Sequence, residues 1–300
     1  MYKYRVYGLN VHSNRKLDCY PHSFDAADII IEFTDSEDEA RRYIGQLVFD
    51  GEPREISAPE GIGKFYFCGE KHIVVYYQNE DYFARYMCHV LFGFGFSYLL
   101  RRRKIFFLHG SGVFIDSGAV VIVGSSEVGK SSLAACLVKQ GGRIISDDTT
   151  RLELNSETPY IYPSYPLRRL YRNTIEHLGL SMEGASEIIS REDKFAFRDD
   201  GQSVFLNREA PVKAIVRIAP SDTKDVALVR EDIKDAILII CRNVYNYQMI
   251  SRSEFTGDYM DFALDVCDRL PIYTLYRPAV GITVQEQAAA ILTEIFNRGG

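Results

Sequence analysis

The sequence predicts an α/β fold: a mixed sheet that carries a glycine-rich loop, preceded by a small, mostly β subdomain. Residues 119–123 are apolar and predict a buried strand, 124–131 hold the glycine-rich motif, and 132–140 predict an apolar helix. Residues 105–115 predict another strand, which the tight turn 116–118 joins to the first as an antiparallel hairpin. Parallel neighbours need a crossover helix between them, so a hairpin directly before the loop implies a mixed sheet.

Short strands dominate the first hundred residues. They are expected at 2–11, 27–33, 64–68 and 72–77, and the last two form a hairpin around Gly69-Glu70. Residues 81–102 predict a helix that closes this part of the chain. We therefore expect an N-terminal subdomain over 1–104 and a second domain, which holds the glycine-rich loop, over 105–300.

Beyond the loop and its helix, expected strands and helices alternate with polar stretches. Strands are expected at 143–146, 150–154, 212–218, 236–240 and 272–275, and helices at 173–180 and 284–296. The strand 143–146 is expected to lie beside the strand that leads into the loop. The Tyr- and Pro-rich stretch 159–170 predicts an ordered loop, the charged stretch 183–202 a mobile flap, and 242–252 is polar and aromatic.

Composition is that of a globular protein with no expected affinity for nucleic acid or membranes. The net charge is −6, with both signs mixed along 300 residues, which argues against a surface that neutralises phosphate backbones. The six cysteines are scattered without a Cys-x-x-Cys pair, which favours free thiols and a cytoplasmic location. The apolar segment 86–100 is short for a bilayer span and predicts a buried helix.

The glycine-rich motif is a complete P-loop. Residues 124–131, Gly-Ser-Ser-Glu-Val-Gly-Lys-Ser, fit G-x-x-x-x-G-K-[ST] between a strand and a helix. The residues expected to bind a nucleotide are Gly124, Ser125, Ser126, Glu127, Val128, Gly129, Lys130, Ser131 and Ser132. Main-chain N–H groups would surround the phosphates, with Lys130 on the β- and γ-oxygens and the Ser131 hydroxyl on Mg²⁺. The alternative is a strand-to-helix turn that matches the pattern by chance.

Three further features predict chemistry beside this loop. Asp147 and Asp148 follow the strand 143–146, where one carboxylate can hold Mg²⁺ and the other can accept a proton. His109 lies on the strand before the loop and is followed by glycine. Arginines that can balance phosphate charge are Arg168, Arg169, Arg172 and Arg242. The alternatives are turn aspartates, a core histidine and surface arginines. The sequence has no Asn-Lys-x-Asp motif for guanine, which favours transfer chemistry over a switch GTPase.

Together these residues resemble the HPr kinase/phosphorylase family. The resemblance covers 107–154 and rests on three motifs at matching spacings: Leu108-His109-Gly110, the P-loop, and the run Gly142 to Asp148. It implies a mixed-sheet P-loop fold akin to phosphoenolpyruvate carboxykinase, ATP and Mg²⁺ as cofactors, and a serine on a polypeptide as acceptor. By this match Asp147 would be the general base, Asp148 would assist it or the metal, and His109 would line the γ-phosphate site.

The segments 4–10 and 163–170 are similar to shorter relatives found beside peptide-modification gene clusters. Some of these relatives, associated with lasso peptides, phosphorylate a serine at the C-terminus of a precursor peptide. That resemblance implies Arg168 as a contact to substrate or phosphate. Within the loop, Ser125 stands where the family often has Asp and Glu127 where it usually has Gly. A glutamate there adds negative charge near the phosphates unless its side chain points outward.

We therefore expect an ATP- and Mg²⁺-dependent serine kinase whose acceptor is a small protein or a peptide. Its catalytic residues would be Asp147, Asp148, His109 and Lys130, and its metal ligands Ser131 and Asp148. Two alternatives stay open: a nucleotide-binding regulator that transfers nothing, and a kinase for a small molecule. HPr kinases are often oligomeric, and no feature of this sequence decides whether the chain forms a homo-oligomer.

Overall fold

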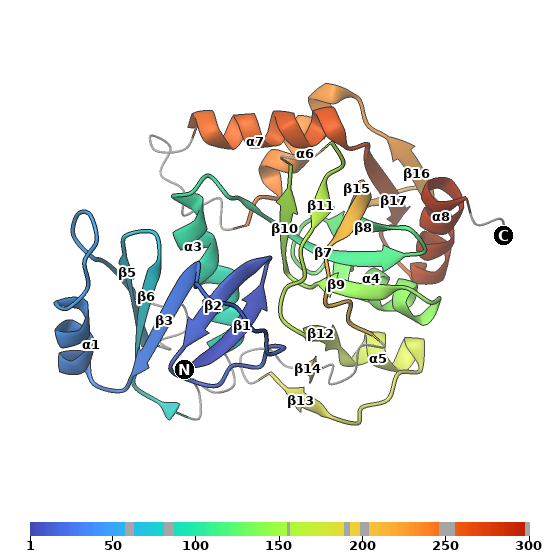
Figure 1. Ribbon diagram of the computed structural model, residues 1–300. Helices are drawn as coiled ribbons and strands as arrows, with labels where there is room; N and C mark the ends of the chain where they lie inside the picture. The colour runs from blue at the N-terminus through green and yellow to red at the C-terminus, as the bar shows by residue number, and fades with distance from the viewer. Residues whose placement is uncertain are drawn as a thin grey trace. The chain divides into compact units, whose positions relative to one another are not determined.

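The computed structural model describes residues 1–57, 63–80, 87–154, 157–188, 193–198, 204–245 and 256–297. Over these residues the chain divides into two compact units, Met1–Ile105 and Phe106–Gly300. Both units combine sheets with helices, so the predicted α/β class is confirmed (Figure 1).

Unit 1 is built on a mixed sheet of order β1-β2-β3-β6-β5-β4. Its strands are β1 (Tyr2–Val6), β2 (Leu9–Ser13), β3 (Ile29–Thr34), β4 (Arg54–Ser57), β5 (Gly63–Cys68) and β6 (His72–Tyr77). β3 runs parallel to β2 and to β6, and the other pairs are antiparallel. Ile29, Ile31 and Phe33 of β3 are buried and alternate with less buried residues, which is the pattern of a strand with one face on a core.

Helical segments cover part of unit 1. α1 (Glu37–Ile44) begins after Ser36, whose hydroxyl accepts a hydrogen bond from the N–H of Glu39. A π-helical turn (Val90–Gly95) runs into α3 (Phe96–Arg101), where the sequence predicts a helix over 81–102; residues 81–86 of that prediction lie outside the described residues. Within the described part of the chain, no helix is long and apolar enough to cross a membrane.

The single strand expected over 2–11 is wrong. Tyr7 and Gly8 have φ of 52° and 74°, and this left-handed pair turns the chain back on itself between β1 and β2. Paired left-handed residues are those of a type I′ hairpin turn, and the glycine at the second position was the sequence signal for it. α1 and β4 were also not predicted, because both segments are short and mostly charged or polar: only Ala40 of α1 is buried, and no residue of β4 is.

Unit 2 is built on a larger sheet of order β11-β10-β7-β8-β15-β17-β16, with β9 also paired to β7. The strands are β7 (Phe107–Ile115), β8 (Gly118–Val123), β9 (Arg143–Ser146), β10 (Thr149–Glu153), β11 (Tyr160–Ile161), β15 (Ala210–Ser221), β16 (Ala227–Arg230) and β17 (Ile272–Pro278). β15 runs parallel to β8 and β17, whereas β7 is antiparallel to β8, β9 and β10. The predicted mixed sheet and the hairpin before the P-loop are therefore confirmed.

Helices pack on both faces of this sheet. They are α4 (Lys130–Lys139), α5 (Arg172–Leu178), α6 (Ile233–Arg242), α7 (Thr256–Arg269) and α8 (Val284–Phe296). Figure 1 shows α4 on one side of the sheet and α6 with α7 on the other. Every residue of β8 is buried. Its Val121 and Val123 share a core with Ile239 of α6 and Val266 of α7, so burial from both sides fixes the strand that leads into the P-loop.

The strand expected at 236–240 is wrong, because these residues belong to α6. The carboxylate of Asp232 caps this helix by accepting hydrogen bonds from the N–H groups of Lys234 and Asp235. Ile239 and Ile240 are buried, whereas Leu238 is 49% exposed, which is the one-sided burial of a surface helix. A short apolar run does not by itself distinguish a strand from a buried turn of helix.

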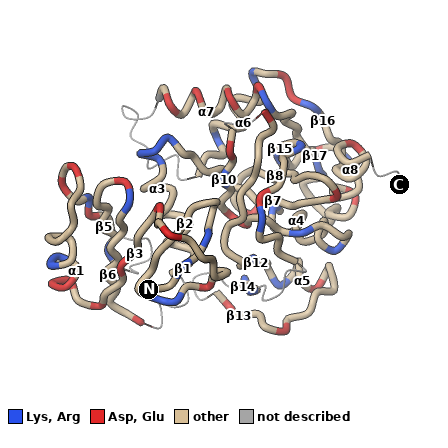
Figure 2. The backbone as a smooth tube through the Cα atoms, in the orientation of Figure 1, with Lys and Arg blue, Asp and Glu red and all other residues tan. Residues whose placement is uncertain are grey.

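The ordered loop predicted for 159–170 and the flap predicted for 183–202 are also partly wrong. Residues 160–161 form β11 of the large sheet, and other described parts of both stretches form a small antiparallel sheet of order β12-β14-β13. Its strands are β12 (Leu167–Tyr171), β13 (Ala185–Glu187) and β14 (Lys194–Arg198). Figure 2 shows basic residues along β12 and β14. Residues 189–192 and 199–202 of the predicted flap, and 246–252 of the polar-aromatic stretch, lie outside the described residues.

Candidate functional site

The P-loop connects β8 to α4 through left-handed backbone at three positions. Gly124 and Gly129 have φ of 144° and 110°, and Glu127 has φ of 64°. A Cβ on Gly124 would lie 3.0 Å from Cγ1 of Val128 and 3.1 Å from the carbonyl oxygen of Ile218, so a side chain at this position would also crowd both neighbours. α4 then begins at Lys130, and its free N–H groups can bind an anion.

Lys130 is held inside this loop. Its ammonium group donates hydrogen bonds to the carbonyl oxygens of Gly124, at 2.9 Å, and Ser125, at 2.8 Å. Burial lowers the pKa of Lys130, while the carboxylates of Asp148 and Asp147 oppose that shift. The Lys130 ammonium is therefore a buried cation held by loop carbonyls, with two carboxylates nearby.

The strand order beside the P-loop differs from the prediction. β9 does not lie next to β8, because β7 pairs with β8 along one edge and with β9 and β10 along the other. Asp147 and Asp148 interrupt that second edge between β9 and β10. Asp148 has φ of 71°, which is uncommon for a residue with a side chain, and its carbonyl oxygen accepts a hydrogen bond from Gly110. The two carboxylates therefore come from a kink in the sheet edge.

Asp147 is almost fully buried and is surrounded by hydrogen-bond donors. Its Oδ1 accepts from the hydroxyl of Ser111 at 2.8 Å and lies 3.4 Å from the hydroxyl of Ser131. Its Oδ2 accepts from the main-chain N–H of Arg169 at 3.0 Å. Both oxygens are thus fixed in place, and one of them faces the first turn of the P-loop helix.

Asp148 faces a different set of groups. Its Oδ1 forms an ion pair with the guanidinium of Arg169 at 3.0 Å and lies 3.7 Å from Nε2 of His109. Burial opposes the charge on Arg169, but Asp148, Tyr165 and Asp147 outweigh it and raise the pKa of Arg169. The structure therefore brings His109, both aspartates and an arginine together at the end of the P-loop.

Arg168, the arginine preferred on sequence grounds, lies on the other face of β12. Neighbouring residues of a strand point to opposite faces, and here Arg169 points to the aspartates. The guanidinium of Arg168 lies over the ring of Phe197, 5.2 Å from its centroid. It lines a pocket of about 300 Å³ together with Leu180, Ser181, Glu183, Phe197, Arg198 and Val204. Arg172 pairs with Asp193 instead.

Oxygen donors of the kind that Mg²⁺ prefers meet at Ser131 and Asp147. The sequence paired Ser131 with Asp148 as metal ligands, whereas the structure places Ser131 beside Asp147 and Asp148 beside Arg169. In the described part of the chain, no group of three or more His, Cys, Asp or Glu residues could hold a metal ion. A magnesium ion at Ser131 and Asp147 would therefore complete its shell with phosphate oxygens and water.

Sequence reasoning missed Ser111, Asn243, Tyr245 and Tyr171. Ser111 lies two residues after His109, so strand alternation alone places both on one face of β7. Asn243 accepts a hydrogen bond from the N–H of Gly124 across 119 residues of sequence. The ring of Tyr245 meets that of His109 edge to face, with 5.8 Å between centroids. No local sequence pattern links Asn243 or Tyr245 to the P-loop.

Glu127, the residue that departs from the family pattern, is engaged by β12. The hydroxyl of Tyr171 donates a hydrogen bond to Oε1 of Glu127 at 3.0 Å. The ammonium of Lys194 lies 4.9 Å from the centroid of the Tyr171 ring. The hydrogen bond is exposed to solvent, so it contributes modestly to stability. The main effect of this hydrogen bond is to hold the Glu127 carboxylate beside β12.

We expect Tyr171→Phe to weaken nucleotide binding, since it removes one of the interactions that position the Glu127 carboxylate in the loop. The dissociation constant for Mg·ATP, measured by titration calorimetry, should rise about two- to fivefold. Adding Glu127→Gln to that variant should restore the affinity, because it removes the charge. Equal dissociation constants in the wild type and Tyr171→Phe would show that the hydrogen bond does not position Glu127.

Burial favours the neutral form of His109. Burial lowers its pKa below the usual 6.5, and the charges of Lys130 and Arg169 act in the same direction, while Asp148 and Asp147 oppose them. The unfolded chain thus takes up a proton at a higher pH than the folded chain does. The free energy of unfolding therefore falls as pH drops below about 6.5, and this contribution is absent above that pH.

Replacing His109 with glutamine should remove that part of the pH dependence. We expect the urea midpoint of wild-type protein to fall more between pH 7.5 and about pH 5.5 than that of His109→Gln. His12 and His72, whose pKa values burial also lowers, are present in both proteins and cancel in the comparison. Parallel pH profiles for the two proteins would contradict the lowered pKa of His109.

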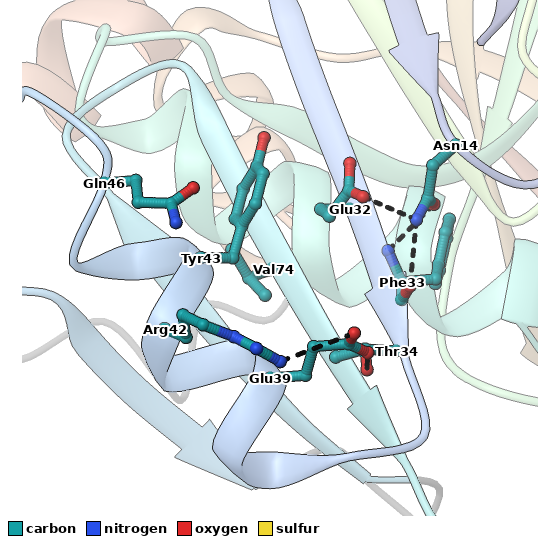
Figure 3. Close-up of a pocket in the computed structure, with 9 residues that line it drawn as sticks. All are labelled: Asn14, Glu32, Phe33, Thr34, Glu39, Arg42, Tyr43, Gln46 and Val74. Carbon is teal, nitrogen blue, oxygen red and sulfur yellow. Dashed lines mark hydrogen bonds and ion pairs between the residues drawn. The ribbon is translucent and has the colours of Figure 1, made fainter.

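Unit 1 holds a separate pocket of about 340 Å³ at α1 (Figure 3). It is lined by Asn14, Glu32, Phe33, Thr34, Glu39, Arg42, Tyr43, Gln46 and Val74. The side-chain amide of Asn14 donates to the carboxylate of Glu32 at 2.7 Å. Burial raises the pKa of Glu32, and this hydrogen bond opposes the shift. None of these residues takes part in the contacts around the P-loop described above.

No protein-family description matches this chain, and no curated protein matches it. Among solved structures, the chain is similar to the Hpr(Ser) kinase/phosphatase from Coxiella burnetii, with 13% sequence identity and a TM-score of 0.35. The likeness covers 65% of this chain and 99% of that one. A likeness of this degree leaves the geometry around the P-loop as the basis for assigning a function.

Proposed function

We propose that this chain is an ATP- and Mg²⁺-dependent kinase that transfers the γ-phosphate to a serine hydroxyl of a small protein or peptide. One observation carries the proposal: the P-loop helix begins beside Asp147, while Asp148, Arg169 and His109 gather at the same place. This arrangement supplies the parts that phosphoryl transfer needs, namely an anion site, a cation site, a proton acceptor and positive charge.

The first of these parts is the phosphate site. The N–H groups at the start of α4 and the ammonium of Lys130 would hold the β- and γ-phosphates. Ser131 and Asp147 would hold Mg²⁺, which when bound supplies positive charge to the oxygens of both phosphates. The hydrogen bond from Ser111 keeps the Asp147 carboxylate oriented toward Ser131.

The second part is the transfer step. The acceptor oxygen forms a bond to the γ-phosphorus while the bond from that phosphorus to the bridging oxygen breaks, so ADP leaves with the electron pair. The family resemblance assigns the acceptor's proton to Asp147, but Asp147 is almost fully buried and its carboxylate lies beside Ser131, at the proposed Mg²⁺ site. We assign it to Asp148, whose side chain is 22% exposed and forms an ion pair with Arg169. Arg169 and Lys130 balance the charge on the transferring group.

The experiment that tests the proposal is label transfer from γ-labelled ATP with Mg²⁺ to a panel of acceptors. The panel holds HPr-like proteins, serine-terminated peptides and common metabolites. Label on a serine in the wild type, and its loss in Lys130→Ala, would support the proposal. Lys139→Ala is the matched control, because Lys139 lies in the same helix and donates to the carbonyl oxygen of Leu178 instead.

The other outcomes separate the two alternatives. Label that reaches only a metabolite would indicate a small-molecule kinase. ATP that binds without any label moving would indicate a nucleotide-binding regulator, and the aspartate pair would then have no catalytic role. Equal transfer by wild type and Lys130→Ala would exclude the P-loop as the phosphate site.

A further inference from the structure

The end of β7 that carries His109 is paired on both edges. β10 covers one edge of residues 107–109. β8 pairs with β7 only as far as Gly110, because the chain leaves the sheet at Gly124 to form the P-loop. The other edge of 107–109 is covered instead by the chain that follows α6, with Val244 opposite Leu108 in an antiparallel bridge. This segment therefore occupies the sheet position that the P-loop vacates.

Asn243 opens this segment and makes three buried contacts. Its side-chain Oδ1 accepts from the N–H of Gly124 at 2.9 Å, and its main-chain oxygen accepts from the N–H of His109 at 2.6 Å. Its side-chain Nδ2 donates to the carbonyl oxygen of Ile239, within α6, at 2.7 Å. Asn243 is 7% exposed, so these bonds are shielded from water.

Tyr245 and Phe107 continue the pairing between this segment and β7. The N–H of Tyr245 donates to the carbonyl oxygen of Phe107 at 2.7 Å, which closes the bridge on its other side. The Tyr245 ring then meets His109. α6 shares a core with β8 through Ile239 and Val123, so the helix that presents Asn243 is itself fixed.

We propose that Asn243 is a positioning residue that holds the P-loop and His109 in one register. Gly124 is the residue at which the chain turns out of β8 into the P-loop, with a φ of 144°. Asn243 holds this residue by accepting the hydrogen bond from its N–H group. The same residue fixes the main chain of His109. An asparagine suits this position because one amide both accepts from Gly124 and donates to Ile239.

The catalytic effect of Asn243 rests on the proposed function. The hydrogen bonds that join Asn243 to Gly124 and His109 can be tested without nucleotide. Amide hydrogen exchange of the full chain, read by NMR or by overlapping peptides, reports the N–H groups of Gly124 and His109 directly. In Asn243→Ala the Gly124 amide loses its acceptor. Exchange at these two amides should rise about tenfold or more, while β17 keeps its protection.

Two further variants separate positioning from general destabilisation. Gln287→Ala removes another buried side-chain amide of the same unit, which donates to Thr283, and it should leave the Gly124 amide protected. Asn243→Asp loses the donor to Ile239 but keeps an acceptor of the same size for the Gly124 amide, so protection at Gly124 should be retained even if Asn243→Ala does not fold. Its added charge should still weaken Mg·ATP binding about tenfold.

In the transfer assay, Asn243→Ala should raise KM for ATP and lower kcat, each about tenfold, while Gln287→Ala should change neither. Unchanged exchange at Gly124 and His109 in Asn243→Ala would overturn the inference. Exchange that rises equally in β17 and in Gln287→Ala would overturn it as well. If exchange responds as expected but wild-type protein moves no phosphate to any acceptor, the link stands and the proposed function falls.

Discussion

Asp147→Asn and Asp148→Asn are each expected to lower phosphoryl transfer about 10³-fold, but through different kinetic constants. For Asp147→Asn, the Mg²⁺ concentration that gives half-maximal rate should rise strongly, because the amide loses the charge beside Ser131. For Asp148→Asn, that concentration should stay near the wild-type value while kcat falls. The measurement is initial rate against Mg²⁺ at saturating ATP, with Mg·ATP affinity determined separately.

The contrast depends on the contacts of the two carboxylates. Asp147 is 5% exposed, and its oxygens accept from Ser111 and from the main chain of Arg169, so an acceptor hydroxyl has little access to it. Asp148 is the more exposed of the two and lies at the ion pair with Arg169. If Asp147→Asn lowers kcat with an unchanged Mg²⁺ requirement, Asp147 is the base, as the family resemblance implies.

Ser111→Ala is a useful companion to these variants. It removes the hydroxyl that donates to Asp147 and leaves the carboxylate in place. A buried carboxylate that loses one donor is destabilised by about 1–3 kcal/mol, so the unfolding free energy should fall by that order. Its effect on rate should resemble a weak form of Asp147→Asn, with a raised Mg²⁺ requirement and little change in kcat at saturating Mg²⁺.

The parts of the site that the sequence predicted are those encoded by contiguous residues. The P-loop needs glycines where the chain turns left-handed, and Gly124 and Gly129 supply them. The hairpin before it follows from a two-residue turn at Asp116-Ser117, and the end of β9 follows from the apolar run before Asp147. Each of these features is decided within about ten residues, which is the range over which pattern and turn chemistry act.

The parts that could not be predicted are decided by pairing between distant segments. Asn243 reaches the P-loop because α6 packs on the sheet, and the sequence of α6 did not distinguish helix from strand. The choice between Arg168 and Arg169 depends on which face of β12 is turned to Asp148. That is set by the register of β12 against β14, and a shift of one residue would exchange them.

Because the register of β12 places Arg168 and Arg169 on opposite faces, replacing each in turn tests the assignment of Arg169. Arg169→Ala should lower kcat about 10³-fold, whereas Arg168→Ala should stay within about threefold of wild type. Arg169 carries the charge beside Asp148, and losing it leaves a carboxylate without its ion-pair partner and the transferring phosphate without one cation. The main-chain N–H that Arg169 donates to Asp147 survives the substitution, so the metal side of the site is kept.

Arg168→Ala is the matched control because it changes the same residue type one position away on the same strand. It removes the contact with Phe197, which is worth about 0.5–1 kcal/mol of stability, and it leaves the ion pair between Arg169 and Asp148 intact. Arg169→Lys should recover part of the rate, since it restores the charge but not the two-pronged geometry of guanidinium. A larger loss of kcat in Arg168→Ala than in Arg169→Ala would mean that the acceptor or phosphate binds on the Phe197 face of β12, and the assignment of Asp148 as proton acceptor would fail with it.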